Sequence, residues 1–142
     1  MSGFVLDASV TMGWCFPSQS RRYSETVLEA LDGAQAITPE VWLLEVANSL
    51  MISERRHRLL RAQSEEFLEK LRLLPIDVES IAETPPWIRE VILLARTYGL
   101  SSYDASYLEL AKRRTLPLAT RDSALARAAV RAGVPLFLDS TV

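Results

Sequence analysis

The stretch Phe4-Val5-Leu6-Asp7-Ala8-Ser9 is the part of this sequence that decides the fold. Its three leading apolar residues predict a short buried strand, and Asp7 follows that strand directly. A carboxylate in this position is desolvated unless it is paired or bound to a metal. Asp7 also suits the cap of a following turn or helix, and that alternative stays open. The Ser9 hydroxyl can join the same site, bind the Asp7 carboxylate or cap a turn.

Short strand-like runs alternate with helical patterns along the rest of the chain. This alternation predicts an α/β fold, a three-layer α/β/α arrangement around a central parallel sheet of about five short strands. The expected strands are Phe4–Leu6, Ala36–Ile37, Ile76–Val78, Pro117–Ala119 and Leu136–Leu138. The length of 142 residues favours a single domain over residues 1–142.

Six segments have the periodicity and the end signals of helices. Thr38 is expected to cap the second of them, with Pro39 in its first turn, and Gly99 is expected to stop the fourth. The expected helices cover Arg21 to Leu31, Pro39 to Arg56, Arg61 to Leu73, Pro85 to Tyr98, Ser102 to Arg113, and Ser123 to Ala132.

Three further acidic residues are expected near the edge of the sheet where Asp7 lies. Glu45 lies about two turns into the helix after the second strand, and Asp122 follows the fourth strand. Asp104 opens the helix before that strand and needs its preceding loop to reach the same edge. Ligands of open α/β sheets bind beyond the carboxyl ends of the strands. Carboxylates gathered there repel one another unless a cation neutralises them, and Mg²⁺ prefers such ligands. A metal-dependent enzyme is therefore the first hypothesis.

Each of these three acids also has a purely structural interpretation. Glu45 shares a helix face with Asn48 and Ser49, and it can reach solvent or pair with an arginine instead. Asp104 follows Ser101 at the spacing of a capping box, which stabilises the start of a helix without any metal. Asp122 is one of several residues that can cap the last helix.

The composition favours a cytoplasmic protein without a membrane segment. No apolar run approaches the roughly 20 residues that span a bilayer, and the amino terminus lacks the pattern of a signal peptide. Cys15 is the single cysteine, so an internal disulfide is excluded. The formal net charge of −2 does not indicate nucleic-acid binding. Of the 16 basic residues only Lys70 and Lys112 are lysines, a skew that suits phosphate binding or reflects a coding bias.

Four segments together resemble the motifs of PIN-domain proteins of the VapC toxin type. The first is Val5-Leu6-Asp7-Ala8-Ser9-Val10, followed by Gly13-Trp14-Cys15-Phe16-Pro17. The second is Leu44-Glu45-Val46-Ala47-Asn48, and the third runs from Leu100 to Ala111. The fourth is Leu118-Ala119-Thr120-Arg121-Asp122-Ser123-Ala124-Leu125. Their order across nearly the whole chain makes the resemblance specific.

The resemblance implies a PIN fold and a Mg²⁺- or Mn²⁺-dependent endoribonuclease, the toxin of a pair with a VapB-type antitoxin. It implies catalytic and metal-binding roles for Asp7, Glu45, Asp104 and Asp122, with Ser9 and Thr120 as polar support of the cofactor site. We expect an RNA substrate and a homodimer. The stretch from Arg55 to Glu83 carries no family motif, so substrate choice can reside there.

Two other functions stay open at this point. One is a PIN-like module that binds RNA or a protein without cleaving. The other is a metal-dependent phosphatase that acts on small phosphate esters, which an acidic α/β crevice can support.

Overall fold

The sheet at the centre of the molecule is parallel throughout, as the sequence predicts. The computed structural model describes residues 3–16 and 21–138. Within them, the strand order is β3-β2-β1-β4. The strands are β1 (Gly3–Leu6), β2 (Gln35–Thr38), β3 (Ile76–Val78) and β4 (Leu118–Ala119). β1 is an interior strand, because Val5 lies opposite Ile37 on one side and Leu118 on the other.

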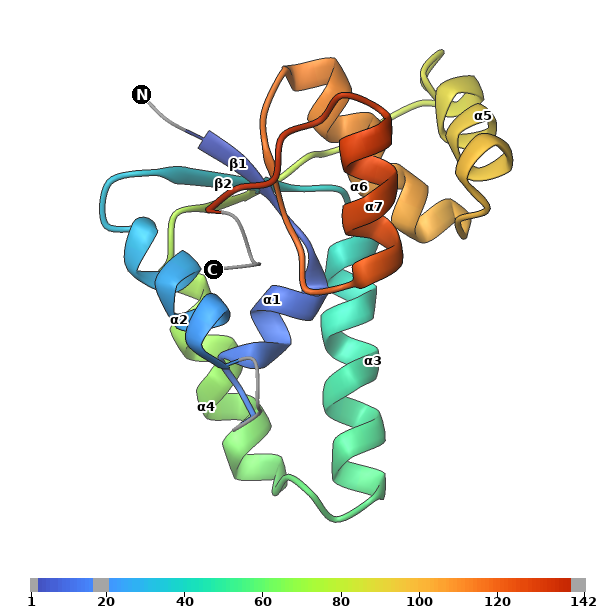
Figure 1. Ribbon diagram of the computed structural model, residues 1–142. Coiled ribbons are helices and arrows are strands. Elements are labelled where there is room, and N and C mark those ends of the chain that lie inside the picture. Colours follow the sequence, from blue (N-terminus) through green and yellow to red (C-terminus); the bar gives the residue numbers. More distant parts are fainter. Residues whose placement is uncertain (1–2, 17–20, 139–142) are drawn as a thin grey trace.

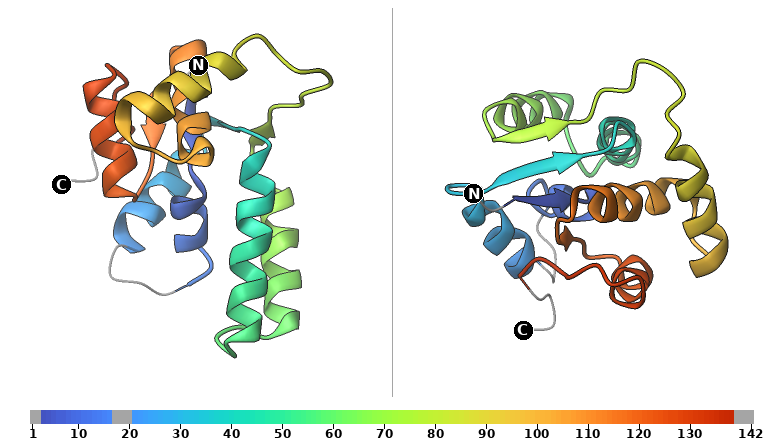
Figure 2. Two further views of the ribbon diagram at one scale, coloured as in Figure 1. Left: turned by 90° about the vertical axis from the view of Figure 1, so that its right-hand side faces the viewer. Right: turned by 90° about the horizontal axis from the view of Figure 1, so that it is seen from above.

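Helices cover both faces of the sheet and complete three layers (Figures 1 and 2). Right-handed crossovers place the helices between β1, β2 and β3 on one face, and the later helices on the other. The first group is α1 (Ala8–Gly13), α2 (Arg21–Ala30), α3 (Val41–Arg55) and α4 (Arg61–Arg72). The second group is α5 (Ile88–Tyr98), α6 (Ser102–Arg114) and α7 (Ser123–Arg131). None of the described helices is long and apolar enough to cross a bilayer.

The expected fifth strand, Leu136–Leu138, is reduced to one bridging residue. The chain returns beside β4 after α7, and Leu136 forms an isolated parallel bridge with Leu118. The Phe137 ring stacks on Phe4 with 4.0 Å between centroids, which holds this segment on the sheet. Leu138 then adopts a positive φ of 49°, so the extended conformation ends before a strand can form.

Two other features differ from the sequence prediction. Thr38 does not cap a helix: it is the last residue of β2, opposite Val78 in β3, and Glu40 occupies the N-cap position of α3. The extra pairing with β3 keeps Thr38 extended, and only the tertiary structure supplies that pairing. Helix α1 was not expected, because six residues are too few to reveal a helical period. Gly99 ends α5 in the left-handed conformation, as predicted.

Gly13 lets α1 and α2 approach each other closely. A Cβ atom built on Gly13 would lie 2.7 Å from the Cβ of Ser24, and closer still to the Ser24 hydroxyl. Ser24 is fully buried on α2, so it has little room to move away. The packing of α1 matters for the rest of the molecule because α1 begins directly after Asp7.

We therefore expect Gly13→Ala to lower the free energy of unfolding by about 1–3 kcal/mol through overpacking. The matched control is Gly33→Ala, because a Cβ atom at Gly33 meets no heavy atom within 4 Å. Urea unfolding of both variants checks this expectation. Equal stability of the two variants would show that α1 and α2 separate easily.

Candidate active site

Four helices begin at the edge of the sheet where the parallel strands end (Figure 1). Asp7 links β1 to α1 and occupies the N-cap position of that helix, and Asp122 occupies the N-cap position of α7. Asp104 lies in the first turn of α6, and Glu45 lies in the second turn of α3. Helix starts carry partial positive charge from unpaired N–H groups, so the ends of these helices favour anions.

Asp7 is the most buried of the four acids, with 4% of its surface exposed. Its Oδ2 atom accepts hydrogen bonds from the hydroxyls of Ser9 and Thr120, both at 2.7 Å. Those hydroxyls are themselves fixed, because Ser9 Oγ accepts from Arg121 N and Thr120 Oγ1 accepts from Asp122 N. Burial raises the pKa of Asp7, while the two hydroxyls oppose the rise.

Glu45 is held by a buried tyrosine of another helix. The Tyr107 hydroxyl on α6 donates a hydrogen bond to Glu45 Oε1 at 2.5 Å. Tyr107 has no exposed surface, so its ring and hydroxyl have one available position. Burial raises the pKa of Glu45, and repulsion from Asp104 adds to the rise.

The capping interpretations of Asp104 and Asp122 have different outcomes. Asp122 does cap α7, because its Oδ1 atom accepts a hydrogen bond from Leu125 N at 3.0 Å. Helix α6 is capped instead by Ser101, whose Oγ accepts from Asp104 N at 3.0 Å. The cap bond uses the Asp104 backbone N–H. Burial raises the pKa of Asp104, and the charges of Asp7 and Asp122 raise it further. The Asp104 carboxylate also interacts with the Ser101 side chain, which opposes the rise of its pKa.

A hydrogen-bonded chain behind Asp7 fixes α3 against α1. The Trp42 indole Nε1 donates to Thr11 Oγ1 at 2.9 Å, and the Thr11 hydroxyl in turn lies 3.5 Å from the Asp7 carbonyl oxygen. Both side chains are buried. This chain sets the position of α3, and therefore of Glu45, relative to Asp7.

Three of the four acids share one arrangement. Each has one carboxylate oxygen held by a protein donor: Oδ2 of Asp7, Oε1 of Glu45 and Oδ1 of Asp122. Among residues 3–16 and 21–138, no donor is recorded for the second oxygen of any of them. That second oxygen is available to a cation.

The four acids influence one another's charge, but they do not form a closed ligand set. The pKa rises of Asp7 and Asp104 each include repulsion from other members of the cluster. Within the described part of the chain, however, no three acidic, histidine or cysteine side chains are placed to hold one ion together. The charge effects among the four acids place them near one another at this edge of the sheet.

A buried acid elsewhere in the molecule shows how this chain neutralises a structural carboxylate. Glu109 is 2% exposed, and Arg113 binds it with Nε at 2.7 Å. Arg113 also binds Glu79 at 2.7 Å, and the second interaction holds the pKa of Glu79 below its usual value. No ion pair of this kind is recorded between described residues for Asp7, Glu45, Asp104 or Asp122. The chemistry of the cluster therefore fits a divalent cation as the missing counter-charge.

The sequence prediction named Ser9 and Thr120, which hold Asp7, but it missed the other residues that position the acids. Tyr107 lies within the third motif, one turn after Asp104 on the same helix, and that spacing is a signal that could have pointed to it. Thr11 and Trp42 carried no sequence signal, because their contact joins residues 31 positions apart.

Comparison with known proteins identifies relatives over most of the chain. Residues 4–131 match the PIN domain family. The chain is 32% identical over 125 residues to Ribonuclease VapC3 of Pyrobaculum aerophilum, a match that covers 86% of this chain and 91% of that protein.

Solved structures with the same fold cover similar lengths. The crystal structure of PAE2754 from Pyrobaculum aerophilum has a TM-score of 0.65 and 25% identity, covering 89% of this chain and 86% of that one. VapBC2 from Rickettsia felis, solved with a DNA fragment from its promoter, has a TM-score of 0.68 and 13% identity, covering 95% and 97%. The second likeness concerns the fold alone.

We expect Asp104→Asn to stabilise the metal-free protein at neutral pH. A carboxyl whose pKa is raised by folding binds more protons when folded, so its contribution to stability falls as the pH rises through the unfolded and then the folded pKa. The variant removes that charge and keeps the Ser101 cap on the backbone. Its gain in unfolding free energy should therefore shrink when the pH is lowered from about 7 to about 4.5.

Urea unfolding in EDTA at several pH values measures this difference. Asp32→Asn, in an exposed turn after α2, serves as the control for a general loss of negative charge. A variant that is less stable than wild type at every pH would mean that Asp104 acts only through the start of its helix.

Proposed function

The chain belongs to the PIN-domain family, and we propose that it is a metal-dependent endoribonuclease that cleaves RNA phosphodiester bonds. The observation that carries this proposal is the set of carboxylates held by one oxygen each, at the edge where four helices begin. The name of its relative, a ribonuclease, supports RNA as the substrate. Asp7, Glu45, Asp104 and Asp122 are the proposed metal-binding residues.

Mg²⁺ or Mn²⁺ is the proposed cofactor, because its oxygen ligands are of the kind this cluster provides. When bound, the ion supplies Lewis-acid activation of a water and stabilises charge on the leaving oxygen. Ser9 and Thr120 act through Asp7: they hold Oδ2 and leave Oδ1 for the ion. The two hydroxyls therefore support the proposed site through the Asp7 carboxylate.

Tyr107 is a positioning residue in this proposal. Its hydroxyl fixes Glu45 Oε1, so Glu45 would hold an ion with little further loss of side-chain freedom. Because burial, followed by the nearby Asp7 and Glu45 carboxylates, holds the pKa of Tyr107 far above its usual value, the phenol keeps its proton and remains a donor.

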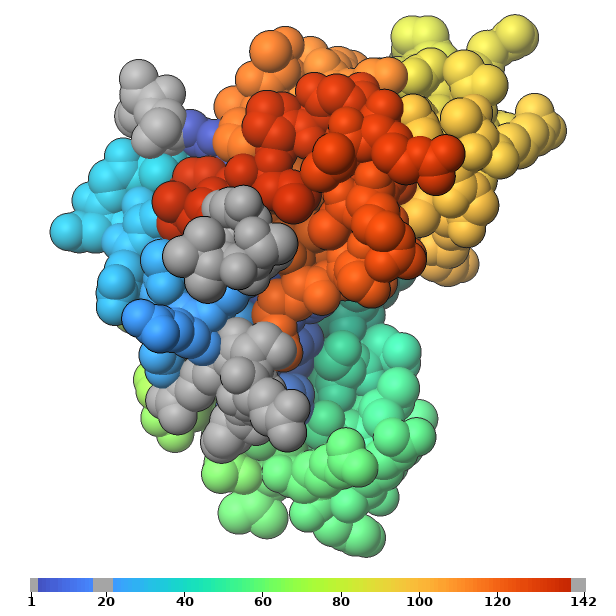
Figure 3. Space-filling view, in the orientation of Figure 1, coloured from blue at the N-terminus to red at the C-terminus, as the bar shows by residue number. Residues whose placement is uncertain are grey.

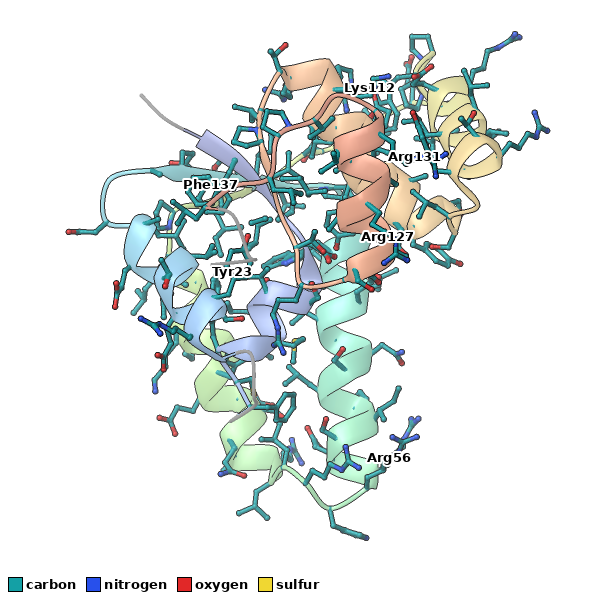
Figure 4. All side chains as sticks on the ribbon, viewed as in Figure 1. Tyr23, Arg56, Lys112, Arg127, Arg131 and Phe137 are labelled. Atoms are coloured by element: carbon teal, nitrogen blue, oxygen red, sulfur yellow. The ribbon has the colours of Figure 1, made fainter. Side chains whose placement is uncertain are left out.

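Arg127 is the candidate for holding the substrate next to the cluster. It is exposed on α7 about one turn and a half beyond Asp122, and Figure 4 shows it near the lower end of that helix. Its guanidinium can bind a phosphate with two hydrogen bonds. Single-stranded or looped RNA suits this site best, because its unpaired backbone can be drawn against the acidic cluster.

We further propose that the protein acts as a cytoplasmic toxin restrained by a VapB-type antitoxin. The four VapC-type motifs support this assignment, and an acidic cluster is an electrostatic target for an arginine or lysine of a partner. A homodimer stays a prediction, as does a single domain over residues 1–142. A silent PIN-like module is disfavoured because all four acids are present. Assay of a small phosphate ester beside RNA distinguishes the nuclease from a phosphatase.

Asp7→Asn should reduce Mg²⁺-dependent RNA cleavage to the level of wild type in EDTA. The substitution keeps the shape of the side chain and removes the ligand charge at the most buried position of the cluster. Cleavage of single-stranded RNA by protein free of contaminating nucleases measures the effect, with Asp32→Asn as the control. Full activity of Asp7→Asn, or undiminished cleavage in excess EDTA, would exclude the proposed chemistry.

Tyr107→Phe should raise the Mg²⁺ concentration for half-maximal cleavage by about 10- to 100-fold, as losses of ligand-positioning hydrogen bonds do. Saturating Mg²⁺ should restore most of the rate, because the phenyl ring still fills the core. Tyr103→Phe on the same helix is the control, since Tyr103 is 61% exposed. An unchanged metal requirement for Tyr107→Phe would show that the hydrogen bond to Glu45 does not position a metal ligand.

A further inference from the structure

The pair of helices α3 and α4 projects from the body of the molecule and ends in a cluster of arginines (Figure 2). Helix α3 ends at Arg55, α4 begins at Arg61, and the short turn between them completes the pair. We call Arg55, Arg56, Arg58 and Arg61 the arginine tip. All four are exposed, and this end forms the lower end of the molecule in the space-filling view (Figure 3).

The arginine tip carries positive charge that the rest of the protein does not neutralise. Within the described residues, none of its four side chains has a recorded ion pair or side-chain hydrogen bond. Several other basic residues are engaged, among them Arg72 with Glu69, Lys70 with Glu66, and Arg114 with Glu79. The tip is therefore a free cationic surface on a chain whose formal net charge is −2.

Backbone hydrogen bonds and a buried leucine fix the conformation of the turn that carries these arginines. His57 adopts a left-handed φ of 58°, and the N–H groups of His57 and Arg58 close the end of α3 on carbonyls of Glu54 and Ser53. Leu59 is 9% exposed and anchors the turn in the core, and Leu60 N donates to Gln63 Oε1 at 2.8 Å. The arginines are thus held at a defined place relative to α3.

Helix α3 connects the arginine tip to the candidate active site. Glu45 and Arg56 are eleven positions apart, which is about three turns, so they share a face of the helix at a separation of about 16 Å along its axis. Ser49 and Ile52 lie between them on that face. Figure 4 shows Arg56 at the far end of α3, pointing away from the body. An extended strand bound at the cluster can follow this face to the tip.

The negative charge of the acidic cluster explains why RNA binding needs positive groups at some distance from it. Four carboxylates repel the phosphates of RNA, and one divalent cation neutralises only half of their formal charge. Affinity for the strand must then come from positive groups outside the cluster. The guanidinium group of arginine matches the geometry of a phosphate, and it binds the RNA backbone without recognising the base sequence.

We propose that the arginine tip binds the phosphate backbone of the RNA substrate, several nucleotides away from the bond that is cleaved. This inference rests on the proposed ribonuclease function. It assigns a role to part of the stretch from Arg55 to Glu83, which carries no family motif.

The test compares the double variant Arg56→Gln/Arg58→Gln with Arg89→Gln/Arg96→Gln, which removes the same charge from exposed positions on α5. Binding of a fluorescein-labelled single-stranded RNA is measured at several salt concentrations in an Asp7→Asn background. Each lost phosphate contact lowers the slope of log affinity against log salt by about 0.7, so the tip variant should lose about 1.4 and the control much less.

The second part of the test measures cleavage kinetics of the two double variants without the Asp7→Asn substitution. The tip variant should have a several-fold lower kcat/KM on a long RNA and an unchanged value on a dinucleotide, which is too short to reach from the cluster to the tip. Equal salt slopes for the two double variants, an equal loss on both substrates, or a defect only in binding an antitoxin would each overturn the proposal. Absence of metal-dependent cleavage of either RNA by wild type would instead overturn the ribonuclease function, and the salt slopes would still report on the tip.

Discussion

A charged group buried at the end of an interior strand is the constraint around which this edge of the molecule is arranged. Asp7 is 4% exposed, and an unpaired carboxylate in such a place costs several kcal/mol in desolvation. The chain reduces that cost with two hydroxyl donors to one oxygen, and with the start of α1 immediately after Asp7. The loop from Thr120 to Asp122 is fixed by the same bonds. The hydrogen bonds that support Asp7 therefore also fix the position of Asp122.

The remaining positions follow from contacts that lead back to this strand end. Trp42 and Thr11 hold α3 against α1, which sets the height of Glu45 above the sheet. Tyr107, buried in the core, joins α6 to Glu45 and carries Asp104 to the same edge. In the metal-free protein, the four acids of the cluster repel one another without a counter-charge. Elsewhere in the molecule, Arg113 neutralises the buried Glu109. Such local conflict between stability and charge is typical of functional sites.

The sequence was sufficient for the general architecture because that information is local. The apolar run before Asp7, the glycine stop at Gly99 and the alternation of strands and helices each act over a few residues, and the PIN resemblance drawn from the motifs is confirmed. The prediction failed where distant pairing decides the outcome. Thr38 extends β2 because β3 lies beside it, and Leu136 only bridges to β4. The link between Glu45 and Tyr107 spans 62 positions and had no sequence signal.

The central claim is that Asp7 Oδ2 is hydrogen-bonded within the protein and that Asp7 Oδ1 binds a cation. Anomalous diffraction from crystals grown with Mn²⁺ tests it most directly. We expect a manganese peak at bonding distance from Asp7 Oδ1, with Ser9 and Thr120 still bound to Oδ2 and the other three acids turned toward the ion. A fully occupied Mn²⁺ elsewhere and none at this cluster, or an ion bound through Oδ2 in place of the two hydroxyls, would contradict the account.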